Sequence, residues 1–214
     1  MTTQTGSDDR RDDGLVELTG PELLVLLSLN QTPASSRTRE MLRLPGLPDD
    51  SALMAAGLSS LVVRRIVEVA GDQLTPLGNA LPLTRIITTA TEWVEAAAIA
   101  GDRTNAALLV GGQGGAVVLE PRPFGIWQIR PLQLGDPLPE AASRFVRASF
   151  GQLEERPFGG SIKVVDAAGD ARTASVRVAV DGTWETTSGP VGEEPAPAPV
   201  QADPSFTLLV TAVR

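Results

Sequence analysis

Three short segments with helical patterns, separated by breaks, follow the polar start of the chain. Their pattern predicts a nearly all-apolar helix from Pro21 to Leu29, a second helix over 35–44, and a third from Asp49 to about Arg65. Thr19 can cap the first helix, and a proline suits its first turn. In the third segment apolar residues recur at intervals of three, four, seven and eight, which is typical of an amphipathic helix.

The pattern changes after the third helix. Residues 66–75 alternate around the Gly-Asp pair at 71–72, which predicts a small β-hairpin. Three helices followed by a hairpin is the element order of a winged helix. A fourth, longer helix is expected from Leu77 to about Ala100, and Gly101 ends it.

Beyond Gly101, apolar and polar residues alternate with a period of two. Three strands are predicted, and the short links between them imply antiparallel neighbours. A helix over 139–151 comes next, and three more strands follow it. The six predicted strands are 106–110, 116–120, 125–130, 161–166, 173–180 continued by 182–185, and Phe206–Val213.

These elements divide the chain into regions. Residues 1–14 are polar and charged, which predicts a disordered tail. Residues 15–100 form a helical, winged-helix-like region. Residues 101–214 form an antiparallel sheet in a β3-α-β3 order, with one covering helix and a flexible loop at 186–204 that is rich in Pro, Gly and Glu. The predicted fold class is therefore α+β.

Composition restricts the chemistry of the chain. Its 214 residues include no Cys, no His and no Tyr. Disulfides, thiolate nucleophiles, imidazole bases and imidazole metal ligands are thereby excluded, and a Ser-His-Asp or Cys-His arrangement cannot be built. We therefore expect no enzyme activity, no metal site and no cofactor.

Two sequence motifs could indicate a binding site, but each also has a purely structural interpretation. The segment Gly111-Gly-Gln-Gly-Gly115 would cradle phosphate if it led into a helix. It leads instead into the apolar strand predicted at 116–120, with no lysine after it, so we interpret it as a hairpin turn. Asp49 and Asp50 stand where acids favour the start of a helix, and we interpret them as capping residues.

Charge and hydropathy bear on partners and location. The formal net charge is −8, which disfavours indiscriminate binding to nucleic acid or anionic membranes. No apolar run is long enough to span a bilayer, and the N-terminus lacks a signal-peptide pattern, so a cytoplasmic protein is expected. Lys163 is the only lysine among 18 basic residues, a bias typical of high-GC bacterial genomes.

The winged-helix order leaves one alternative function, that of a DNA-binding transcriptional regulator. In that case Arg37, Arg43, Arg64 and Arg65 would line the DNA-facing surface. Residues 21–75 contain five Arg but six acids, and the third helix begins with two of those acids. Nucleic acid is therefore the less favoured partner.

Protein binding is the function that remains. Trp127 alternates with isoleucines in a predicted strand and is a candidate interface residue. Phe124 precedes that strand. Phe206 and Leu208 lie in the apolar strand predicted at the end of the chain, where an exposed sheet edge would offer a partner a place to dock. These four residues are the predicted partner-binding residues.

Three stretches of the sequence carry a family resemblance: Leu58–Pro76, Glu92-Trp-Val-Glu95, and the strands that begin Ala106-Ala-Leu-Leu-Val and Gly125-Ile-Trp-Gln-Ile. Together they resemble the EspG family, the cytosolic chaperones of the actinobacterial type VII (ESX) secretion system. The resemblance implies an antiparallel sheet with helices and binding to the helical tip of a PE–PPE pair, which is kept soluble for export. It makes a helical secreted pair the expected partner and leaves the oligomeric state open.

Overall fold

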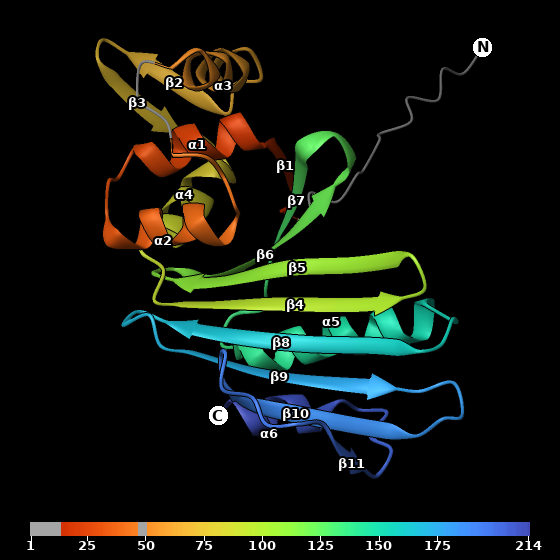
Figure 1. Cartoon of the computed structure of the whole chain (residues 1–214). Coiled ribbons are helices and arrows are strands. Elements are labelled where there is room, and N and C mark those ends of the chain that lie inside the picture. Colours follow the sequence, from red (N-terminus) through yellow and green to blue (C-terminus); the bar gives the residue numbers. More distant parts are fainter. Residues whose placement is uncertain (1–13, 47–50) are drawn as a thin grey trace, which may run out of the picture.

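The computed structural model describes residues 14–46 and 51–214, and a nine-stranded antiparallel sheet forms its centre (Figure 1). The strand order is β1-β7-β6-β5-β4-β8-β9-β10-β11. The strands are β1 Val16–Thr19, β4 Glu92–Ala100, β5 Arg103–Gly112, β6 Gly115–Arg122, β7 Ile126–Pro131, β8 Phe158–Asp166, β9 Ala171–Val178, β10 Trp184–Pro190 and β11 Ala198–Val200. A separate hairpin consists of β2 Val67–Ala70 and β3 Gln73–Pro76.

The described ranges contain six α-helices, of which α3 packs on α1 and the separate hairpin and the others pack around the large sheet. They are α1 Gly20–Ser28, α2 Pro33–Met41, α3 Ala52–Val63, α4 Ala80–Thr88, α5 Leu138–Gln152 and α6 Thr207–Val213. A 3-10 turn, Pro123–Gly125, joins β6 to β7. The α+β class is confirmed, and so is the order of three helices followed by a hairpin.

The large sheet has two similar halves that meet between β4 and β8. Read outward from this pair, the order is β4-β5-β6-β7 on one side and β8-β9-β10-β11 on the other. A helix follows each four-stranded meander in the sequence: α5 follows the first and α6 the second. The short edge strand β1 then adds to β7, with Leu18 opposite Trp127.

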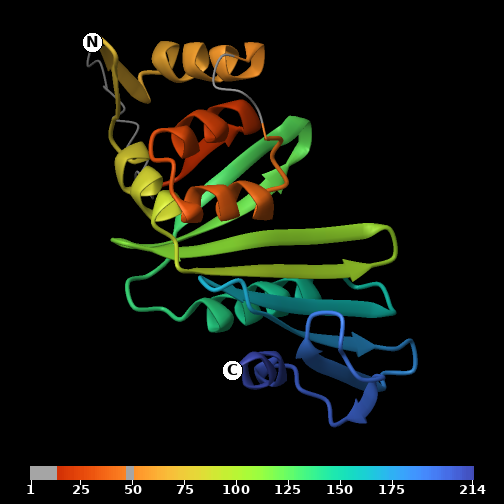
Figure 2. The same cartoon turned by 60° about the vertical axis from the view of Figure 1, so that its left-hand side comes forward.

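Each face of the sheet has its own apolar core. The first core joins alternate residues of the central strands, among them Val94, Ala96 and Ile162, to α5 and α6. The second lies over the β5–β7 half of the opposite face, where α1, α2 and α4 pack (Figure 2). Trp93 belongs to this second core and is fully buried, and its indole N–H donates to Thr38 Oγ1 at 2.9 Å.

Side-chain caps begin the first three helices. Thr19 and Glu22 form a reciprocal capping box at α1, and Thr32 and Ser35 form one at α2. Ser51 accepts a hydrogen bond from the backbone N–H of Met54 at the start of α3. The predicted Thr19 cap is confirmed. Asp49 and Asp50 lie outside the described residues, as do residues 1–13 of the predicted tail.

The long helix predicted from Leu77 to Ala100 is wrong. Helix α4 ends at Thr88, and residues 92–100 form β4 at the centre of the sheet. The alanine-rich sequence favours a helix by propensity alone. Pairing with β5 and β8 on both sides overrides that preference, because every second residue from Val94 to Ala100 is buried against α5.

The end of the chain also differs from the prediction. Residues 207–213 form helix α6, with Leu209, Val210 and Val213 buried at helical spacing. A short apolar run does not distinguish strand from helix by periodicity. The Asp203 carboxylate accepts the backbone N–H of Leu208 and so favours the helix. The loop predicted over 186–204 contains the end of β10 and all of β11.

Candidate functional site

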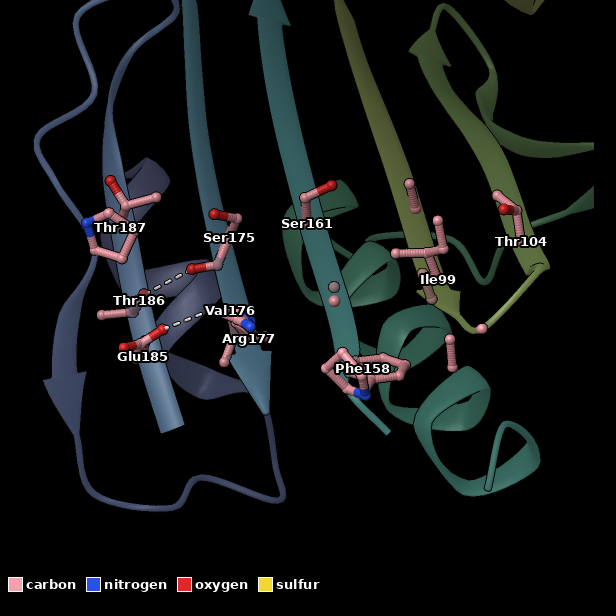
Figure 3. A pocket seen from close by; sticks show the side chains of 18 residues that line it. Ile99, Thr104, Phe158, Ser161, Ser175, Val176, Arg177, Glu185, Thr186 and Thr187 are labelled. Atoms are coloured by element: carbon pink, nitrogen blue, oxygen red, sulfur yellow. Dashed lines mark hydrogen bonds and ion pairs between the residues drawn. The ribbon is translucent and has the colours of Figure 1, made fainter. Parts of the chain in front are cut away.

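Half of one sheet face carries no helix in the described part of the chain. Helices α1, α2 and α4 cover the β5–β7 half of this face, and α5 and α6 lie behind the sheet (Figures 1 and 3). A shallow depression of about 830 Å³ occupies the uncovered part over β4, β8, β9 and β10. We call this surface, with Ala97, Ser161, Ser175 and Thr187 at its middle, the open face.

Strand register aligns small side chains across the open face. Ala97 of β4 lies opposite Ala106 of β5 and Ser161 of β8. Ser161 lies opposite Ser175 of β9, and Ser175 lies opposite Thr187 of β10. These five residues form a continuous row, the central row, and Figure 3 shows Ser161, Ser175 and Thr187 on neighbouring strands. Because the side chains are short, a partner's backbone can approach the sheet closely.

Ion pairs lie on both sides of the central row. On β4 and β8, two residues away from the central row, Lys163 Nζ is 3.0 Å from Glu95 Oε2. On β9 and β10, two residues away on the opposite side of the row, Arg177 Nη1 is 3.6 Å from Glu185 Oε2. Ile99 lies on the same side of the central row as the second ion pair, opposite Thr104 of β5 and Gly159 of β8, and its side chain is half exposed. The open face is therefore an apolar and hydroxyl-lined strip between two ion pairs.

A groove extends the open face toward the helices. It has a volume of about 480 Å³ and lies between the C-terminal end of α2 and the sheet. Met41 and Arg43 line the helix side, and Trp127 and Lys163 line the sheet side. Ala97 and Ser161 line both the groove and the depression, so the two are continuous.

The predicted partner-binding residues occupy separate places. Trp127 lines the groove, where it also packs against the helical core. Phe124 is 98% exposed at the β6–β7 turn. Phe206 is only 1% exposed, among Phe150, Phe158 and Trp184 on the helix-covered side of the sheet. Leu208 lies partly exposed on α6. The four residues do not form one surface, because the predicted terminal strand is a helix.

The arginines proposed for DNA contact do not lie on one surface either. Arg37 pairs with Glu40 on α2, and Arg43 lies at the end of that helix in the groove. Arg64 and Arg65 follow α3. That helix, from Ala52 to Val63, contains no basic residue, although it holds the position of a DNA-reading helix.

Arg64 takes part instead in a polar network around the buried Glu22. Its Nη1 donates to both carboxylate oxygens of Glu22, at 2.7 and 2.8 Å, and its Nη2 donates to the Glu17 carbonyl at 2.8 Å. Glu22 is fully buried and also accepts from the Ser60 hydroxyl and the backbone N–H of Thr19. The network ties α3 to the beginning of α1.

Sequence reasoning missed the open face. Its signal is the alternation within β8 and β9, where buried Ile162, Ala174 and Val176 alternate with Ser161, Ser175 and their neighbours. A solvated strand face usually carries charged or large polar side chains. The small hydroxyls lie between two charged rows of the same face, and their alignment across strands depends on the register.

Two negative findings apply to residues 14–46 and 51–214. In these ranges no group of three or more Asp, Glu, His or Cys side chains is arranged to hold a metal ion. None of their helices has the length and apolar character needed to cross a bilayer.

The fold, by contrast, has a relative of known structure. No protein-family model matches the chain, and no curated protein matches its sequence. The chain is similar to the Mycobacterium tuberculosis type VII secretion system chaperone EspG5, solved in complex with the PE25–PPE41 dimer, with a TM-score of 0.61. The match covers 93% of this chain and 95% of that chain at 10% identity, so it establishes a shared EspG-like fold.

Proposed function

We propose that this protein is a non-catalytic chaperone or adaptor that binds another protein on its open face. The observation that carries this proposal is the central row, a strip of small side chains between the Glu95–Lys163 and Arg177–Glu185 ion pairs. The same face of the β5–β7 half is already occupied by α1, α2 and α4. Helices therefore fit this sheet surface, and the open face offers the equivalent place to a partner's helix.

Burial of apolar surface would drive the association. It contributes roughly 25 cal/mol per Å² removed from water, less the cost of association. Ile99 and the methyl groups of the central row supply apolar area, and the depression and the groove give it a concave shape. The two ion pairs at the borders would fix the direction in which a helix lies, because they present opposite charges in a fixed order.

The partner we propose is a pair of helical secreted proteins, bound in the cytoplasm before export. The fold shared with a chaperone that was solved with the PE25–PPE41 dimer supports this class of partner. Trp127 in the groove and the exposed Phe124 remain proposed contacts. Leu208 is a more distant one, and the buried Phe206 would act by holding α6 in place.

DNA binding has no specific observation in its favour. The uncharged α3 offers no contact to phosphate, and the guanidinium of Arg64 is engaged by Glu22. A regulator would also need its basic residues on one surface.

The test is affinity purification of the full chain from its native cytosol, with co-purifying proteins identified by mass spectrometry. We expect a helical pair in stoichiometric amount. Ser161→Glu places a charge in the middle of the central row and should reduce recovery of the pair at least tenfold. Ala148→Glu, an exposed position on α5 on the other side of the sheet, is the matched control and should leave recovery unchanged. Equal recovery with both variants, or recovery of DNA alone, would contradict the proposal.

A further inference from the structure

Helix α3 exposes an apolar surface at the end of the molecule farthest from β8–β11 (Figure 1). Val63 is 82% exposed, and Leu53 and Val62 are 38% and 39% exposed. Only Met54, Gly57 and Leu61 of this helix are buried, and they face α1. A surface helix normally carries charged or polar residues on its outward side. The outward apolar residues Leu53, Val62 and Val63 are therefore left uncovered within the described chain.

The orientation of α3 is fixed, so this surface cannot turn inward. A Cβ atom on Gly57 would lie 2.3 Å from the Pro21 carbonyl oxygen, which shows how closely α3 packs on α1. The Glu22–Arg64 interaction ties the C-terminal end of α3 to the same helix. The outward side of α3 is thus presented rigidly to whatever binds it.

Charge limits which surface of this protein can meet a second copy. The chain carries a net charge of −8, so two copies repel one another at long range. Helix α3 is an exception, because none of its 12 residues is charged. The middle of a contact between two copies would therefore be uncharged, with Asp72, Arg64 and Arg65 only at its margins.

The exposed side of α3 is also complementary to itself. With about 3.6 residues per turn, Ala52, Ala56, Ser59 and Val63 lie along the middle of that side. If a second α3 lies antiparallel across it on a two-fold axis, each larger residue faces a smaller one. The facing pairs are Val63 with Ala52, Ser59 with Ala56, Leu53 with Ser60, and Val62 with Ala55.

We infer that α3 is the interface of a symmetric, antiparallel homodimer of this chain. A helix of 12 residues is about 18 Å long, which makes the interface smaller than a standard one. The expected dissociation constant is therefore micromolar. The open face lies at the other end of the molecule and stays accessible, so a dimer would present two copies of it.

Analytical ultracentrifugation of the full chain over a concentration series tests the dimer. We expect a reversible monomer–dimer equilibrium. Ala56→Glu, at an exposed position near the proposed two-fold axis, should weaken it at least tenfold without changing the circular dichroism spectrum or the urea midpoint. Ala148→Glu on α5 adds the same charge elsewhere and should leave the dissociation constant within about twofold. A wild-type chain that stays monomeric at several hundred micromolar would overturn the inference.

Engineered cysteines test the antiparallel register. The chain has no cysteine of its own, so there is no background. Positions 52 and 63 are about 16 Å apart along one helix, too far for a disulfide within it. Under mild oxidation, Ala52→Cys and Val63→Cys should each fail to cross-link alone and should form disulfide-linked dimers when mixed. Cross-linking of either single variant alone, or none in the mixture, would reject this register. Neither experiment depends on partner binding at the open face.

Discussion

Glu22 illustrates how one carboxylate can position a whole helix. It has no solvent-accessible surface and receives hydrogen bonds from the backbone N–H of Thr19, from the Ser60 hydroxyl and from Arg64. Glu22→Gln keeps the shape but removes the charge. We expect a loss of about 2 kcal/mol in the free energy of unfolding, because charge-assisted hydrogen bonds are replaced by weaker ones. Urea denaturation measures this loss of stability. Glu68→Gln, at an exposed position on β2, is the control, and it should change the free energy of unfolding by less than about 0.5 kcal/mol.

The same carboxylate makes stability depend on pH. Burial alone would raise the pKa of Glu22, but the hydrogen bonds from Thr19, Ser60 and Arg64 outweigh it, and the pKa lies below its ordinary value of 4.5. A lowered pKa means that the folded state favours the charged form. The contribution to stability is therefore complete above pH 4.5 and is lost as the pH falls through the lowered pKa. The stability gap between wild type and Glu22→Gln should be full at pH 7 and should shrink below pH 4.5; a gap that stays constant down to the acid transition would contradict this account.

Two arginines occupy positions that favour glycine. Arg43 and Arg65 follow the last residues of α2 and α3 with left-handed φ values of 55° and 56°. The left-handed conformation costs a residue with a side chain about 1 kcal/mol, and glycine avoids this cost. Replacement by glycine recovers only part of it, because glycine has more conformational freedom to lose when the chain folds. Arg43→Gly and Arg65→Gly should each stabilise the protein by about 0.5 kcal/mol in thermal unfolding. Arg37→Gly, within α2, should instead destabilise it by about 1 kcal/mol.

At the scale of elements, the sequence predicted best where pattern and propensity agree. The strands β5 to β7 and the helix α5 were placed from alternation and helical spacing, and they are confirmed. Residues 92–100 and 207–213 were misassigned, because an alanine-rich run and a short apolar run each fit two structures. Their tertiary neighbours decide between them: β5 and β8 in the first case, and β8, β9 and α5 in the second.

The candidate site was harder to predict than the fold. Trp127 was recognisable because a tryptophan in an alternating strand stands out. The central row was not, because Ser161 and Ser175 become neighbours only through the pairing of β8 with β9. Without the register, single serines in two strands carry no more weight than any surface serine.

Prolines protect the β11 edge of the large sheet against pairing with a further strand. Strand β11 pairs with β10 through only three residues, and its neighbourhood contains Pro195, Pro197 and Pro199. Prolines lack the N–H that an added strand would need. Replacing Pro197 and Pro199 with threonine should therefore increase aggregation on mild heating, measured by light scattering. Pro45→Thr, outside the sheet, is the control; no difference between the two variants would mean that the edge is protected by other means.

At the scale of the molecule, the two halves of the sheet differ in what covers them. Helices α1, α2 and α4 bury the β5–β7 half, and the β8–β10 half of the same face keeps small, partly exposed side chains. A strand surface left to solvent gains stability from β-branched residues, so serines at its centre are a poor choice for stability alone. Their presence is explained if close approach by a partner matters more.

This conflict between stability and binding can be measured. Ser161→Val with Ser175→Val adds two β-branched, cross-strand neighbours to the open face, and should raise the free energy of unfolding by about 1 kcal/mol. The added methyl groups lift a docked helix away from the sheet, so recovery of the co-purifying pair should fall at least tenfold. Arg172→Val, exposed on the other side of β9, also adds a β-branched residue to the sheet and should leave recovery unchanged. If the double variant gains stability and still recovers its partner in full, the serines are not there for docking, and the open face is not where the partner binds.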